Sequence, residues 1–383
     1  MMRRAVLVCI DGCGPEYLSA AGAFRWVDFS AEGWSMIPSV TNVNNVSILT
    51  GAYPREHGVT GNCYYDRAAR SWVYMETPDF IRVETLVERI AELGLRTAVL
   101  ASKDKLRALL GRGAGLSLSA ERPPRWLRER LGEPPHIYSI EVDSWLMRAA
   151  VEVARSYAPD FMYISTTDYA MHMHPPGHAE SRRHIRLIED GLKGLLEVYE
   201  ERGDEVLLCV TADHGMGDVE RAVDLEVALR LRGVSVSVNV LIADRYVLHH
   251  RNMGGAAYVY LDDPSELYRA LEALREVEGV EVALTAWQAA RVYNLDPERI
   301  GDVVVLAARG YAFGLVGEEV VEVKLRSHGS IHEGRVPIMV HGADLDRRPR
   351  ENRELAGLIL EWLRQRDEPV SYTHLTLPTT ERV

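Results

Sequence analysis

Strand-like apolar runs that end close to acidic residues recur along this chain, and they constrain its fold more than any other feature. Three of these runs are each followed by an aspartate: residues 5–10 by Asp11, residues 161–165 by Asp168, and residues 205–210 by Asp213. Helix-type segments separate the runs, and this alternation predicts an α/β fold with a doubly wound, mostly parallel sheet. Because functional groups gather at the carboxyl ends of parallel strands, we expect the three aspartates to lie close together.

The pattern of strand-like and helical segments changes near residue 233. From there to about residue 320, short strand-like runs surround one helical segment, residues 264–276, which suggests a smaller α+β insertion. We therefore expect an α/β core formed by residues 1–232 and 321–366, with residues 233–320 forming an α+β cap. Residues 370–383 show no helix or strand period and resemble translated adapter sequence, so we interpret them as a non-native tail.

Composition disfavours several classes of function. The 383-residue chain carries a formal net charge of −12, which argues against a general nucleic-acid binder. No apolar run approaches the roughly 18 residues that a membrane span requires, and the first residues are better explained by a strand than by a signal peptide. The scattered cysteines, Cys9, Cys13, Cys63 and Cys209, suit buried thiols in a reducing compartment. We expect a cytoplasmic monomer or homodimer that binds neither nucleic acid nor membrane.

Residues 39–51, SVTNVNNVSILTG, predict a helix with a hydroxyl group at its N-terminus. Thr41 or Asn42 can cap the first turn, and Gly51 suits the C-terminus. Free N–H groups and the helix dipole favour an anion such as phosphate at this end of a helix. Thr41 is therefore a candidate nucleophile, although a capped surface helix without any chemistry explains the same pattern.

Two lysines, Lys103 and Lys105, follow the apolar run at residues 96–101. Side chains two positions apart lie on the same side only if the segment is extended, since they diverge on a helix. In an extended segment the two ammonium groups can bind one anionic group. The alternative interpretation is a pair of solvated lysines at the start of a helix.

The aspartates and several histidines have the types and spacing of metal ligands. Asp168 and His172 are four residues apart, so one helical turn places both on one face. The candidate ligands are Asp11, Asp168, His172, Asp213, His214 and His328. They can form two clusters of three around two zinc-like ions, with a hydroxyl group completing one cluster. The alternative histidines are His174, His178 and His332.

The order of these motifs resembles that of the alkaline phosphatase superfamily, on its nucleotide pyrophosphatase/phosphodiesterase branch. The motifs are Asp11, T-N-x-N-N-x-S-x-x-T-G, D-x-x-x-H, T-A-D-H-G-M and S-H-G, and the resemblance covers roughly residues 5–365. Within this branch the chain is most similar to the phosphonoacetate hydrolases, on the strength of Gly61-Asn62 and the segment from Ser102 to Leu106.

The resemblance implies a site with two zinc ions, although other divalent metals are possible, and a small anionic phosphonate as substrate. One zinc would be held by Asp11, Thr41, Asp213 and His214, and the other by Asp168, His172 and His328. The substrate ligands would be Asn62 on a phosphonate oxygen, with Lys103 and Lys105 on the carboxylate. Thr41 would attack phosphorus, and cleavage of the carbon–phosphorus bond would give acetate and phosphate.

Two alternatives remain open from the sequence. A phosphodiesterase or nucleotide pyrophosphatase of the same superfamily would use the same metal site, with Tyr64 and Tyr65 stacking on a base and the lysines incidental. A zinc-binding scaffold without turnover would keep the metal ligands but would not depend on Thr41. The presence of Thr41 beside a complete ligand set gives no support to the scaffold.

Overall fold

The computed structural model describes residues 2–244, 249–345 and 347–365. The predicted non-native tail, residues 370–383, lies outside the described residues. Within the described ranges, no helix combines the length and the apolar character that crossing a membrane would demand.

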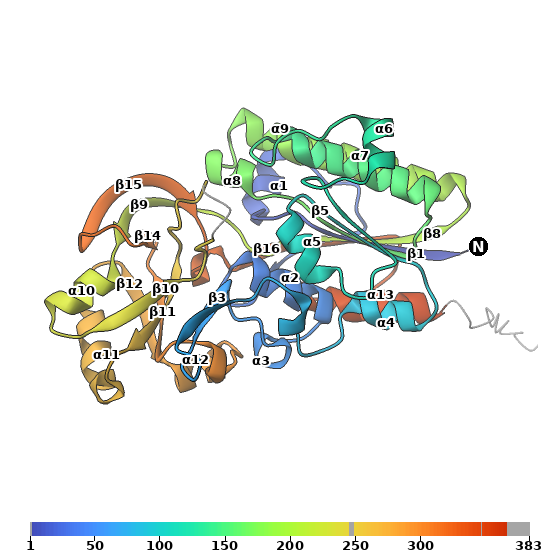
Figure 1. Ribbon diagram of the computed structural model, residues 1–383. Helices are drawn as coiled ribbons and strands as arrows, with labels where there is room; N and C mark the ends of the chain where they lie inside the picture. The colour runs from blue at the N-terminus through green and yellow to red at the C-terminus, as the bar shows by residue number, and fades with distance from the viewer. Residues whose placement is uncertain (1, 245–248, 346, 366–383) are drawn as a thin grey trace, which may run out of the picture.

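A seven-stranded sheet in the order β2-β16-β8-β1-β7-β5-β6 forms the centre of the larger part of the molecule (Figure 1). Its parallel strands are β1 (Arg3–Cys9), β5 (Thr97–Ala101), β6 (Leu116–Ser119), β7 (Phe161–Ser165) and β8 (Glu205–Thr211). Strands β16 (Arg335–His341) and β2 (Phe29–Trp34) complete one edge, where β16 pairs antiparallel with both β8 and β2. The predicted α/β fold with a mostly parallel sheet is confirmed.

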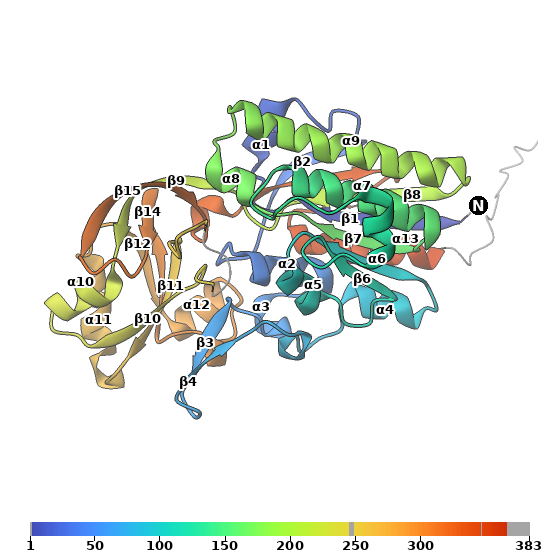
Figure 2. The ribbon, with the colours of Figure 1, turned by 45° about the horizontal axis from the view of Figure 1, so that its top comes forward.

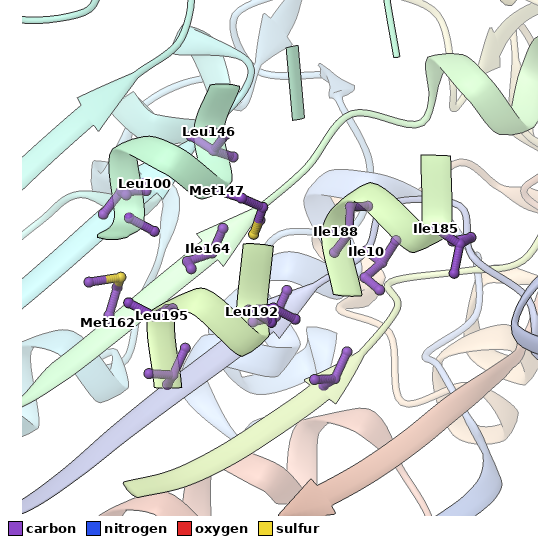
Figure 3. Close-up of a cluster of buried hydrophobic side chains, with 14 of the residues drawn as sticks. Ile10, Leu100, Leu146, Met147, Met162, Ile164, Ile185, Ile188, Leu192 and Leu195 are labelled. Atoms are coloured by element: carbon purple, nitrogen blue, oxygen red, sulfur yellow. The ribbon is translucent and has the colours of Figure 1, made fainter. Parts of the chain in front are cut away.

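Helices cover both faces of this sheet, as buried parallel strands require. One face carries α1 (Pro15–Ala21), α6 (Arg125–Leu131), α7 (Glu141–Ser156) and α9 (Ala179–Glu201). The other carries α2 (Thr41–Thr50), α4 (Leu86–Glu92), α5 (Asp104–Leu110) and α13 (Leu355–Arg364). On the first face, Ile185 and Ile188 of α9 lie beside Ile10, and Leu192 lies nearer to Met162 and Ile164 of the sheet (Figure 3).

A smaller part of the molecule is built around two further sheets (Figure 1). One is antiparallel, in the order β10 (Val236–Val240), β11 (Ala256–Leu261), β13 (Val303–Ala307) and β12 (Val280–Thr285). The other contains β14 (Gly310–Phe313), β9 (Gly217–Val223) and β15 (Val320–Ser327). The accompanying helices are α10 (Leu225–Leu231), α11 (Leu267–Arg275) and α12 (Ala286–Val292). The division of the chain at residues 232 and 321 stays a prediction.

The remaining elements lie near the junction of the two parts. They are the helices α3 (Pro54–His57) and α8 (Tyr169–Met173) and the strands β3 (Cys63–Asp66) and β4 (Ser71–Tyr74). Strands β3 and β4 form an antiparallel hairpin that projects beside the smaller part (Figure 2). The turns after β1, β5, β7 and β8 lead to the candidate functional residues.

Candidate active site

Two groups of buried carboxylates and imidazoles lie at the carboxyl edge of the central sheet. One contains Asp11, Asp213 and His214, and the other contains Asp168, His172 and His328. In each group one oxygen or nitrogen atom per residue lies within 4.8 Å of those from the other two. The six side chains come from the turns after β1, β7 and β8, from α8, and from the turn after β15. This is the same grouping that the sequence motifs imply.

Thr41 is the first residue of α2 and faces the first group. Its Oγ1 lies 3.2 Å from Nε2 of His214. The expectation that Thr41 or Asn42 caps this helix is wrong, because Val40 occupies the N-cap position and no side chain caps the first turn. Thr41 is instead the first residue of the helix, and its hydroxyl group lies beside His214 of the first ligand group. Gly51 ends the helix with a φ of 71°, the left-handed conformation predicted for it.

The Asp213 carboxylate is held by hydrogen bonds from three directions. Its Oδ1 accepts from the backbone N–H groups of Gly12 (3.1 Å) and His214 (3.0 Å), and its Oδ2 accepts from Nδ2 of Asn45 (3.0 Å). Asp11 contrasts with it, since its Oδ1 is buried and has no hydrogen-bond partner among the described residues. An orphaned carboxylate oxygen in a buried acidic cluster fits a cation ligand, because burying it without a partner is costly.

Each of the three histidines turns Nδ1 to a backbone carbonyl group. The pairs are His172 with Arg326 O (2.7 Å), His214 with Gly215 O (2.9 Å) and His328 with Ser39 O (2.8 Å). A carbonyl oxygen only accepts, so Nδ1 carries the proton and Nε2 presents its lone pair. Nε2 of His172 lies 3.1 Å from Asp168 Oδ2, and Nε2 of His328 lies 4.0 Å from the same oxygen. This donor set suits divalent metals such as zinc.

The alternative histidines lie elsewhere. His332 contacts Oε2 of Glu281 through Nε2 at 2.5 Å. His174 and His178 stack on each other with ring centroids 4.2 Å apart. None of the three belongs to either metal-ligand group among the described residues, so the structure places His328, rather than His332, beside Asp168.

Both candidate substrate lysines form ion pairs. Nζ of Lys103 lies 2.6 Å from Asp168 Oδ1 and 3.5 Å from Asp11 Oδ2. Nζ of Lys105 lies 2.5 Å from Asp244 Oδ2 and 3.5 Å from Glu76 Oε1. Lys103 is the extended N-cap residue of α5, so the extended geometry assumed for the pair holds only at Lys103.

The ion pairs change the proton affinity of the carboxylates. Burial alone raises the pKa of Asp168, but the charges of Lys103 and neighbouring histidines hold it well below its usual range. Burial, with the charges of Asp168 and Asp213, raises the pKa of Asp11. The charge of Lys103 offsets this rise only in part, and a divalent cation bound at Asp11 would lower the pKa further, which again fits a metal-binding role.

One cavity of about 530 Å³ borders the second ligand group and both lysines. Its lining includes Thr41, Asn62, Lys103, Lys105, Asp168 and His328. The amide nitrogen of Asn62 donates to the carbonyl groups of Ile242 and Ala243, at 3.3 Å each. Among the described residues that line the cavity, none is Phe, Tyr or Trp. Tyr65 instead packs on Trp72 and Tyr260, with ring centroids 5.3 and 5.8 Å away.

Sequence reasoning missed the contribution of Asp244, His249 and His250. Nε2 of His249 lies 3.3 Å from Asp168 Oδ1, and the His249 ring lies 4.7 Å from that of His172. Asp244 pairs with Lys105, and His250 lines the cavity. The sequence signal that could have found this contribution is the adjacent pair His249 and His250, which lies between strand-like runs.

Comparison with known proteins agrees with this arrangement. A sequence model of the family described as type I phosphodiesterase / nucleotide pyrophosphatase matches residues 5–330. Venom phosphodiesterase of Macrovipera lebetinus is 24% identical over 194 residues, which is 48% of this chain. The chain spans only 21% of the length of that curated relative.

Solved structures resemble the chain over nearly its whole length. Phosphonoacetate hydrolase from Sinorhizobium meliloti 1021 is 30% identical, with TM-scores of 0.85 in complex with phosphonoformate and 0.84 in complex with phosphonoacetate. In both comparisons the alignment covers 94% of this chain and 95% of the other. Murine ectonucleotide pyrophosphatase / phosphodiesterase 5 in complex with AMP has a TM-score of 0.69 at 14% identity, again covering 94% and 95%, and shows the shared fold. The resemblance to phosphonoacetate hydrolase that the motifs indicate is confirmed.

Proposed function

This chain belongs to the type I phosphodiesterase / nucleotide pyrophosphatase family, and from that premise we propose that it hydrolyses the carbon–phosphorus bond of phosphonoacetate. That it is a hydrolytic enzyme follows from the family and from its likeness to phosphonoacetate hydrolase. The observation that carries the narrower proposal is a cavity whose lining brings Thr41 together with the two lysines, Lys103 and Lys105. Asp168 and His328 of the second ligand group line the same cavity. A substrate with a phosphonate at one end and a carboxylate at the other matches those two kinds of group.

We assign the substrate's phosphonate to Thr41 and Asn62, and its carboxylate to Lys103 and Lys105. Both lysines already bind carboxylates, those of Asp168 and Asp244. A substrate carboxylate would replace these partners only in part. An ammonium group has three donors, so each lysine can bind the substrate and keep a hydrogen bond to its present partner. Asn62 would turn its amide from two backbone carbonyl groups towards a phosphonate oxygen.

Two divalent cations, preferably zinc, would bind at the two ligand groups, lower the pKa of the Thr41 hydroxyl and stabilise charge on the phosphonate oxygens. The Thr41 hydroxyl group gives its proton to water, and its Oγ1 bonds to phosphorus while the carbon–phosphorus bond breaks. The bonding pair moves to carbon and spreads into the adjacent carboxylate, where the lysine ammonium groups stabilise it. That carbon takes a proton from water to give acetate. A second water attacks the phospho-threonine, releasing phosphate and restoring Thr41.

The sister activity, hydrolysis of a phosphodiester or nucleoside pyrophosphate, would use the same clusters and Thr41. Its predicted stacking pair, Tyr64 and Tyr65, is not among the described residues that line the cavity. Phosphonoacetate therefore remains the preferred substrate. A non-catalytic scaffold would not explain why the Thr41 hydroxyl group lies beside His214.

Phosphate release from phosphonoacetate, an aryl phosphodiester and 2-aminoethylphosphonate, measured with the zinc-loaded protein, tests the proposal. We expect release from phosphonoacetate and little from 2-aminoethylphosphonate, which lacks the carboxylate. Preference for the diester would overturn the substrate assignment while keeping the metal site. Inactivity on all three with two zinc ions bound would favour the scaffold.

We also place the enzyme in the cytoplasm as a monomer or homodimer that acts on a free small molecule. The net charge of −12 supports the absence of a nucleic-acid partner.

A further inference from the structure

A carboxylate with no role in the proposed reaction lies behind the active site. Asp143 is in the first turn of α7 and is fully buried. Its position falls on the face of α7 that also carries Leu146 and Met147, which pack into the apolar core (Figure 3). Burial raises the pKa of Asp143 to about 7, which reflects how poorly this environment solvates a charge. Such a residue destabilises a core unless its partners compensate for it.

The hydrogen bonds of Asp143 go to two strand-end turns. Its Oδ1 accepts from the Ser102 hydroxyl at 2.5 Å and from the Thr167 backbone N–H at 3.1 Å. Its Oδ2 lies 3.4 Å from the same N–H and 3.6 Å from Nε2 of His184. An acid in the first turn of a helix commonly serves the N–H groups of its own helix. Asp143 instead accepts hydrogen bonds from residues in the turns after β5 and β7.

Each of these partners immediately precedes a residue of the active site. Ser102 precedes Lys103, and Thr167 precedes Asp168. The side chains of Lys103 and Asp168 form an ion pair, with Nζ and Oδ1 2.6 Å apart. The contacts therefore close a ring, in which Asp143 joins the Ser102 hydroxyl group to the Thr167 backbone N–H, and the ion pair joins the side chains of the two following residues.

We propose that Asp143 is a positioning residue that sets the separation of Lys103 and Asp168, and thereby both the substrate carboxylate site and the second metal-ligand group. The proposal rests on the function assigned above to Lys103 and Asp168. Asp143 touches neither substrate nor metal and acts through Ser102 and Thr167. Partners that orient metal ligands from behind are known to matter for affinity and rate.

The chain offers variants that separate positioning from folding. Ser102→Ala removes only the hydroxyl donor next to Lys103. Asp143→Ala removes both contacts, while Asp143→Asn keeps an oxygen that can accept from Ser102 and Thr167 and places an amide towards His184. Asp224→Ala is a matched control: Asp224 is also buried, but it caps α10 in the smaller part of the molecule.

We expect Ser102→Ala to raise KM for phosphonoacetate by about tenfold and to leave kinetics on an aryl phosphodiester within about twofold. Asp143→Ala should lower kcat on both substrates and speed the loss of one of two metal ions to a chelator, by about tenfold each. Asp143→Asn should restore both properties to within about threefold of wild type. Asp224→Ala should lower Tm alone.

The proposal is overturned if Ser102→Ala and Asp143→Ala behave as Asp224→Ala does, losing Tm while KM and metal retention stay at wild-type values. If Asp143→Ala does not fold, the KM split in Ser102→Ala decides. If wild type proves inactive on phosphonoacetate, the proposed substrate fails, but chelator resistance and diester kinetics of the Asp143 variants still test the positioning role.

Discussion

Thr41 Oγ1 and His214 Nε2 lie 3.2 Å apart, although Thr41 begins α2 and His214 lies in the turn after β8. Nδ1 of His214 faces the carbonyl group of Gly215, so its Nε2 is the unprotonated nitrogen. The hydroxyl group of Thr41 therefore meets the lone pair that would also bind a metal. This relationship places a candidate nucleophile beside the first ligand group, where its proton can be removed.

Thr41→Ala should abolish turnover and leave the metal bound. The variant keeps Asp11, Asp213 and His214, so metal content measured by mass spectrometry should be unchanged. Activity should fall below about 1% of wild type, since a covalent route depends on its nucleophile. Higher residual activity with full metal content would indicate direct attack by water.

His328→Ala should reduce bound metal from about two ions per chain to about one, because a zinc site rarely tolerates the loss of one of three protein ligands. His332→Ala is the matched control, since His332 lies four positions away but contacts Glu281 instead of the cluster. Metal titration of both variants would distinguish them. Equal losses, or a loss in His332→Ala alone, would reassign the second ligand group.

Lys105 and Asp244 form an ion pair at 2.5 Å, and the substrate carboxylate must compete with Asp244 for this lysine. Lys105→Ala should raise KM for phosphonoacetate by about tenfold, roughly 1.4 kcal/mol, with little effect on an aryl phosphodiester. Asp244→Asn should shift KM for phosphonoacetate in the opposite direction, because it removes the competing charge. Steady-state kinetics on both substrates provide the measurement. A parallel loss on the two substrates would discard the lysine assignment and favour the phosphodiesterase.

The sequence predicted the parts of the site that lie at strand ends. Buried parallel strands have a recognisable apolar signature, and their carboxyl ends must meet at one edge, so Asp11, Asp168 and Asp213 could be grouped before the fold was known. The helical spacing of His172 from Asp168 added a fourth ligand. These inferences depend on local pattern and on sheet topology alone.

The contacts that escaped prediction join segments far apart in the chain. Asp244 and His249 reach the site because the smaller part of the molecule packs over the sheet edge, and no local period encodes that packing. The missing cap of α2 had another cause. Threonine is a good N-cap residue, but Thr41 turns its hydroxyl group to His214, so tertiary placement overrides local preference.

His57 should make the fold sensitive to acid through a mechanism separate from catalysis. The residue is fully buried, and burial, together with the charge of Arg299, lowers its pKa from 6.5 to about 3. Its Nδ1 accepts from the Val59 N–H at 3.1 Å, and its Nε2 lies 2.8 Å from the Ser47 hydroxyl oxygen. A second ring proton would face the Val59 N–H, so the folded protein keeps this imidazole neutral.

Because the folded pKa of His57 lies below the unfolded value, the unfolded chain takes up a proton first as the pH falls. The contribution of His57 to the free energy of unfolding is therefore fully present above pH 6.5 and is lost progressively as the pH falls towards 3. At about pH 5 the loss amounts to ~2 kcal/mol, at about 1.4 kcal/mol per pH unit. His57→Asn keeps an acceptor for Val59 but does not titrate there. Urea unfolding of equally metal-loaded wild type and variant should thus show the stability advantage of wild type shrinking by ~2 kcal/mol between about pH 7 and pH 5. A constant advantage across that range would mean that His57 titrates alike in both states.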